Sequence, residues 1–150
     1  MTISGGDCTL LCDIADQEGL NLPELSPATQ QVMVEALDKP TVLGNPLDVE
    51  DLQRMKPEGF ERCLEKFFAE ANFDMLGVRL NLPEAITPAA EKLYTQISAL
   101  SKANDKRVFV LTRASEPPAQ VWYDKLNSPG LTFTGDYRKP VRAMSRLRKT

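Results

Sequence analysis

The sequence predicts an α/β fold in which a mostly parallel sheet carries helices on both faces. Three observations favour it: short apolar runs alternate with longer segments of helical spacing, two of the runs are nearly continuous, and Ser-Pro, Thr-Pro or Gly signals bound several of the helical segments. Strands that alternate with helices pair in parallel, because each connecting helix packs back on a face of the sheet. The 150 residues, 42% of them hydrophobic, fit one domain with a core of its own.

The first part of the chain contains two clear helix patterns. Residues 1–3 look like the stub of a strand, and the helix that follows is expected to end at Gly19. Its apolar stripe consists of Cys8, Leu11, Cys12 and Ala15. Ser26 and Pro27 are typical of a helix start and predict a second helix that runs to about Leu37.

The rest of the chain continues the alternation. A brief strand is expected to end in the Gly-Asn-Pro turn of residues 44–46. Helices are then expected over residues 56–72, 86–104, 116–130 and 136–150, and strands over residues 73–80, 106–112 and 131–135. Pro140 is expected to bend the last helix or to delay its start.

Composition and charge narrow the class of protein. The chain has no run of eighteen apolar residues and no basic segment followed by an apolar one, so we expect a cytoplasmic protein without a membrane span. A net charge of −3 and a pI near 5.1 argue against a nucleic-acid partner. Residues 1–75 hold 15 acidic and 5 basic side chains, and residues 76–150 hold 6 and 13. Such polarity can orient a protein partner, although two differently charged solvated surfaces explain it equally well.

Metal binding and autonomous catalysis are not expected. The chain contains no histidine, and its three cysteines lack the number and spacing of zinc ligands. Cys8, Cys12 and Cys63 are instead expected to be reduced and buried. We therefore predict no catalytic residue in this chain.

The glycine turn after the first strand is the main candidate site. Ser4, Gly5 and Gly6 precede a helix, whose unpaired N–H groups and dipole attract an anion such as phosphate. Asp7 and Cys8 are expected to supply further N–H groups of the helix start. The Asp7 carboxylate competes for the same N–H groups and is also able to cap the helix when no ligand is bound. A tight turn with an N-cap, and no ligand, explains the same residues.

Other loops that leave strands are secondary candidates, because ligands of parallel sheets bind outside the carboxyl ends of the strands. Asn45 and Asp48 lie in the first of these loops, where a plain turn is an equally good explanation. The others are residues 79–83 and 112–118.

Two helical features are best explained by packing and solvation. Adjacent helical positions point about 100° apart, so one of Trp122 and Tyr123 should reach the core and the other the rim. The basic side chains of the last helix are expected to form a solvated face. They are Arg138, Arg142, Arg146, Arg148 and Lys149.

The opening motifs resemble a known family. The succession of "SGG", "CDIADQEGLNLPELSPATQ" and "NPLD" is similar to the C-terminal flavodoxin-like domain of the alpha part of nucleoside-diphosphate-forming acyl-CoA synthetases, relatives of succinyl-CoA synthetase. These motifs cover residues 2–48, and "GLTFTGDYRKPVRAMSRL" is similar to the end of that domain. The resemblance implies a flavodoxin-like three-layer sandwich that spans residues 1–150 and belongs to a longer multidomain enzyme.

The resemblance also implies a role in an acid-CoA ligase. In such enzymes an acyl phosphate and a phosphohistidine on a mobile loop carry the phosphoryl group, and two helices point their N-termini at the phosphohistidine. Ser4, Gly5 and Gly6 look like the start of one of these helices. The implied partners are the histidine-loop, CoA-binding and ATP-grasp domains or subunits. This domain would bind no cofactor itself, whereas the full enzyme would use CoA, ATP or ADP, phosphate and Mg²⁺, and the isolated chain would be inactive.

Two other functions remain open at this point. The chain could be a non-catalytic regulatory or protein-interaction module of a synthetase-like protein. A binder of a small molecule or a flavin would need more than the short glycine turn that the sequence offers.

Overall fold

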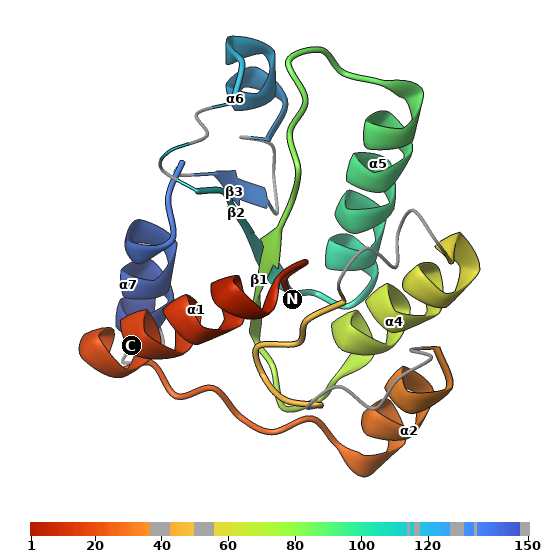
Figure 1. Cartoon of the computed structure of the whole chain (residues 1–150), viewed down its shortest axis with the longest axis vertical. Helices are drawn as coiled ribbons and strands as arrows, with labels where there is room; N and C mark the ends of the chain where they lie inside the picture. Colours follow the sequence, from red (N-terminus) through yellow and green to blue (C-terminus); the bar gives the residue numbers. More distant parts are fainter. Residues whose placement is uncertain are drawn as a thin grey trace.

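The computed structural model describes residues 1–36, 43–49, 56–113, 115, 118–126, 131–133 and 135–147. Its helices are α1 (Gly5–Glu18), α2 (Pro27–Ala36), α4 (Pro57–Ala69), α5 (Pro88–Ala103), α6 (Gln120–Leu126) and α7 (Arg138–Leu147). Its strands are β1 (Met75–Arg79), β2 (Arg107–Leu111) and β3 (Leu131–Phe133). Helices surround a central parallel sheet (Figure 1). The α/β fold is confirmed.

The sheet has the strand order of the flavodoxin-like folds. β1, β2 and β3 are neighbours in this order, and both pairs are parallel. On the other side of β1 lies the first segment of the chain, where Arg79 N donates to Met1 O at 3.0 Å. Thr2 in turn pairs in parallel with Asp48. The spatial order is therefore second, first, third, fourth, fifth, which places a switch point between the first segment and β1.

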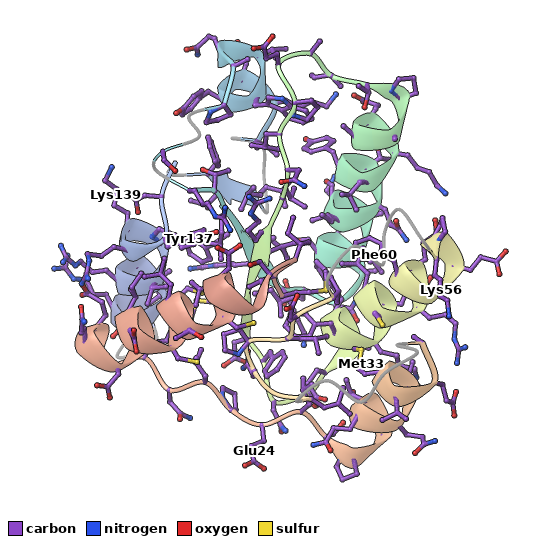
Figure 2. All side chains as sticks on the ribbon, viewed as in Figure 1. Glu24, Met33, Lys56, Phe60, Tyr137 and Lys139 are labelled. Atoms are coloured by element: carbon purple, nitrogen blue, oxygen red, sulfur yellow. The ribbon has the colours of Figure 1, made fainter. Side chains whose placement is uncertain are left out.

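The two faces of the sheet pack against different helices because side chains alternate along a strand. Phe109 and Leu111 of β2 form a core cluster with α1 and α7, which lie side by side in Figure 1. Val108 and Val110 face the other way and belong to the larger cluster with α2, α4 and α6. Met33 of α2 and Phe60 of α4, both labelled in Figure 2, are among the residues of this larger core.

Local signals account for several helix ends. Gly19 takes the left-handed conformation (φ 66°) that lets its N–H close the end of α1. The Ser26 hydroxyl accepts from Thr29 N at 3.3 Å, and Thr87 caps α5 through Ala90 N at 3.2 Å. Asp136 accepts from Lys139 N at 2.7 Å at the start of α7. The starts of α2 and α5 were predicted from the sequence. Pro140 does not delay α7, because it lies in the first turn of that helix, where its missing N–H would have no intrahelical acceptor.

The structure corrects two other predictions, the position of a strand and the burial of a cysteine. The segment after the Gly-Asn-Pro turn pairs with the first strand, since Thr2 N donates to Leu47 O at 2.8 Å, whereas we predicted a strand that ends in this turn. Residues 39–42 of that predicted strand lie outside the described residues, as does the predicted end of the second helix at Leu37. Cys63 is buried as expected, but Cys12 is exposed because it points away from the core side of α1.

The arginine face of α7 is also more than a solvated surface. Arg142 Nε donates to Glu18 Oε2 at 2.9 Å, and Arg138 joins the same carboxylate at 3.1 Å. These contacts tie α7 to the end of α1, whereas residues 148–150 lie outside the described range.

The positions of Trp122 and Tyr123 are as predicted. Trp122 is buried, and Tyr123 packs at the rim against Phe133, with ring centroids 4.9 Å apart.

No helix within the described ranges is both long enough and apolar enough to cross a lipid bilayer.

Candidate functional site

The predicted glycine turn lies at the switch point of the sheet. Residues 1–3 run into Ser4, and α1 begins at Gly5 beside the carboxyl end of β1. Figure 1 shows the start of α1 next to β1, near the middle of the molecule. Ligands of doubly wound sheets bind in the crevice at such a point, because the chain leaves the two adjacent strands in opposite directions.

The first N–H groups of α1 divide into two kinds. Ser4 is the N-cap in an extended conformation, and its side chain makes no capping hydrogen bond. Its carbonyl oxygen accepts from Asp7 N at 3.0 Å and from Cys8 N at 3.1 Å. The N–H groups of Asp7 and Cys8, which we predicted as phosphate donors, are therefore already used, and the donors left for an anion are those of Gly5 and Gly6.

Neither the backbone angles nor the neighbouring atoms require a glycine at position 5 or at position 6. Both are exposed, and neither has a positive φ angle. A Cβ atom on Gly5 would have the Asp48 carboxylate as its nearest neighbour at 3.5 Å, and one on Gly6 would have the Ser4 hydroxyl at 3.6 Å, which are ordinary contacts. The glycines thus leave open space above the helix start, where a side chain would block an approaching ligand.

Asp7 does not cap the helix but turns inward. Its side chain is 4% exposed, with Arg79 Nε 3.6 Å from one carboxylate oxygen and Arg113 Nη2 3.1 Å from the other. Arg113 Nε also donates to that second oxygen at 3.1 Å. Arg79 is as buried as Asp7, whereas the Arg113 side chain is 42% exposed. A buried carboxylate is tolerated here because two guanidinium groups neutralise it.

Two hydroxyl groups complete this edge. Tyr137 follows β3 and Thr112 follows β2, and both are buried. Within the described part of the chain the Thr112 hydroxyl has no hydrogen-bond partner, whereas the Tyr137 hydroxyl faces Arg79 and Asp7. Figure 2 shows Tyr137 at the start of α7, on the side of the sheet. Burial raises the pKa of Tyr137, so its phenol is neutral. The hydrogen bond from Arg113 to Asp7 raises the pKa of Arg113, so the neighbouring guanidinium is permanently charged.

The side chains of the other predicted site residues do not come together in one place. Asp48 lies against Gly5, at the positive end of the α1 dipole, where a carboxylate is stabilised. Asn45 instead donates to Pro23 O at 2.9 Å. The Cys8 thiol lies 3.2 Å from the Thr2 hydroxyl, and burial raises its pKa, so it remains protonated at neutral pH.

Sequence reasoning included Arg79 and Arg113 only within the secondary candidate loops, residues 79–83 and 112–118, and missed Tyr137. A signal did exist for the two arginines, since each comes at the end of an apolar strand and begins a loop that leaves the sheet. No sequence signal marked Tyr137, because its position depends on how β3 and α7 are joined in space.

Comparison with known proteins supports the fold. No family model matches the chain, and no curated protein matches it. Among solved structures, the crystal structure of PH0766 from Pyrococcus horikoshii OT3 is similar, with a TM-score of 0.67 and 19% sequence identity over 98% of this chain. The chain spans 34% of the length of that protein. At this identity the likeness shows a shared α/β, flavodoxin-like fold.

Proposed function

We propose that this chain is the flavodoxin-like domain of a nucleoside-diphosphate-forming acyl-CoA synthetase, in which the N-terminus of α1 docks a phosphohistidine carried by another domain. The observation that carries the proposal is the exposed pair Gly5 and Gly6 at the switch point of the sheet, because neither glycine is needed by its φ angle or by its neighbours. The order of the motifs in residues 2–48 supports the same conclusion.

The docking would use N–H donors and the helix dipole. A phosphoryl group above Gly5 would accept from two N–H groups that have no acceptor within α1. Among Asp7, Arg79 and Arg113, the Arg113 side chain is the one that is partly exposed, at 42%. It is therefore able to reach a ligand while Arg79 holds Asp7. Positive charge fixed beside a transferring phosphoryl group stabilises the negative charge that it carries.

The remaining chemistry would belong to other domains. This chain has no histidine, so the phosphorylated residue must come from a partner domain. Binding of CoA, ATP or ADP and Mg²⁺ would likewise lie in the CoA-binding and ATP-grasp domains. We therefore expect no ligase activity from the 150 residues alone.

The direct test is an amide NMR titration of the chain with inorganic phosphate. We expect saturable shifts at the amides of Gly5 and Gly6, and their loss in Gly6→Asp, because the new carboxylate both fills the open space and repels the anion. Thr95→Asp adds the same charge on the exposed side of α5 and is the matched control. Unchanged amides in a folded protein, up to a phosphate concentration that shifts known weak sites, would contradict the proposal.

One observation favours the second candidate, a non-catalytic interaction module. The Asp7 carboxylate already pairs with both arginines, and Asp48 already lies at the helix start, so the positive potential is partly neutralised within the chain. An interaction module would keep this arrangement unchanged when phosphate is added. The same titration therefore separates the two functions.

A further inference from the structure

An open cavity of about 170 Å³ lies at the amino ends of the strands, away from the glycine turn. Connecting segments of the chain meet at its mouth: residues 20–23 after α1, residues 45–46, and residues 72–74 between α4 and β1. The cavity therefore lies apart from the proposed phosphate site, and its lining comes from segments that are far apart in the sequence.

The interior of the cavity is apolar. It is lined by Leu11 and Val141, which belong to the core cluster on one face of the sheet, and by Phe67, which belongs to the cluster on the other face. An engineered apolar cavity of about 150 Å³ is known to bind benzene. The interior is thus large enough for one benzene-sized group.

The rim of the cavity is polar and presents mainly hydrogen-bond acceptors. Asn72 and Asp74 are exposed, and Asn45 is half-buried. The amide nitrogen of Asn45 donates to Pro23 O at 2.9 Å, and that of Asn72 donates to Glu24 O at 3.4 Å. The groups left for a ligand are therefore the oxygen atoms of these two amides and the Asp74 carboxylate.

The charges around the cavity favour a cation. Among the described residues of the lining, Asp74 is the one with a charged side chain. Burial lowers the pKa of the Met1 amine to about 5, so this amine is neutral at pH 7 and does not repel a cation. The charge of Lys106 also acts on Asp74, but the Lys106 ammonium donates to Glu70 O and does not line the cavity.

We propose that this cavity is a binding site for a small amine, whose benzene-sized apolar body fills the interior and whose ammonium group meets the Asp74 carboxylate at the rim. An ammonium group is a pure donor, which matches a rim of carboxylate and amide oxygens. A neutral apolar molecule would use the interior alone, and an anion would be repelled by Asp74. The inference does not depend on the proposed function.

The test is an NMR titration at pH 7 with benzylamine, benzyl alcohol and benzoate, which share a ring and differ in charge. We expect benzylamine to shift the methyl signals of Leu11 and Val141 and to saturate. It should bind about fivefold more tightly than benzyl alcohol, which is the contribution of one exposed ion pair, and benzoate should bind most weakly.

Two variants locate the ammonium group. Asp74→Asn should reduce the affinity for benzylamine to that for benzyl alcohol, and the protein should stay folded because Asp74 is exposed. Asp124→Asn removes an equal charge from the exposed side of α6 and should leave the preference for the amine unchanged.

Three results would overturn the proposal. Unchanged methyl signals in the presence of benzylamine would show that the cavity is not a binding site. Equal affinities for the three probes, or tighter binding of benzoate, would show that the rim does not select a cation. A preference for benzylamine that survives Asp74→Asn would place the ammonium group elsewhere.

Discussion

The two ends of the central sheet differ in the kind of group that they leave incomplete. At the carboxyl ends of the strands, the helix start at Gly5 and Gly6 lies near a buried charge cluster formed by Asp7, Arg79 and Arg113. At the amino ends lies a cavity of about 170 Å³, which is lined mainly by apolar side chains and also by Asn21, Asn72 and Asp74. Charges and N–H groups at one end can recognise an anion, whereas the cavity at the other end offers mainly apolar surface.

The difference teaches where the molecule is able to recognise an anion. At the polar end, ion pairs hold Asp7 inward, and the N–H groups of Gly5 and Gly6 are left for a ligand. The cavity at the other end has a mainly apolar lining. Changes at the polar end should therefore alter both phosphate binding and stability, whereas changes at the other end should alter stability and leave phosphate binding unchanged.

The largest effect should come from the Asp7 carboxylate. Asp7→Asn removes the carboxylate that two guanidinium groups share, one of them buried, so we expect a loss of about 3–5 kcal/mol in the free energy of unfolding. Urea denaturation measures it. The control is Glu61→Gln, which breaks the exposed ion pair with Lys92 and should cost under about 1 kcal/mol. Equal losses in the two variants would show that the cluster does not hold this end of the sheet.

The next effect concerns the amine at the apolar end. The pKa of the Met1 amine is about 5 in the folded chain and about 8 when unfolded, so the unfolded state binds the proton first as the pH falls. Stability should therefore decrease between pH 8 and pH 5 by up to about 4 kcal/mol, and level off below pH 5. Acetylation of the amine removes this contribution. If chains with and without the acetyl group respond alike to pH, the amine is not buried as the structure has it.

Phosphate affinity should respond to charge at the polar end. Asp48→Asn removes a negative charge that lies against Gly5, so we expect phosphate to bind about fivefold more tightly. Arg113→Gln should weaken binding by a similar factor. NMR titration gives both dissociation constants, and Lys139→Gln, which changes an exposed charge on α7, should leave them unchanged. If Asp48→Asn weakened phosphate binding and Arg113→Gln strengthened it, phosphate would bind elsewhere.

The smallest effect should come from the α1–α7 contact, which lies apart from both ends. Hydrogen bonds from Arg142, and then from Arg138, lower the pKa of Glu18 to about 2. Its contribution is complete above the unfolded pKa of about 4.5 and is lost as the pH falls toward 2. The wild type should thus lose slightly more stability than Glu18→Gln over this range. Parallel acid titrations of the two proteins would refute the contribution.

Local patterns predicted the helices well because caps and apolar spacing lie within a few residues of each other. Ser26, Thr87 and Gly19 mark helix ends in the sequence and in the structure alike. The pairing of Thr2 with Asp48 was not readable, since it joins segments that lie 46 positions apart. The site was predicted in the same partial way: its glycines stand together in the chain, whereas Arg79 and Arg113 reach Asp7 only through the order of the strands.

The most direct test of the central claim uses a short peptide that carries a freshly prepared phosphohistidine, with the unphosphorylated peptide as its control. If the start of α1 docks a phosphohistidine, the phosphorylated peptide should shift the amides of Gly5 and Gly6 and saturate, and the control peptide should shift neither. If the two peptides produce the same shifts, or if neither peptide moves these amides in the folded chain, α1 does not perform this role.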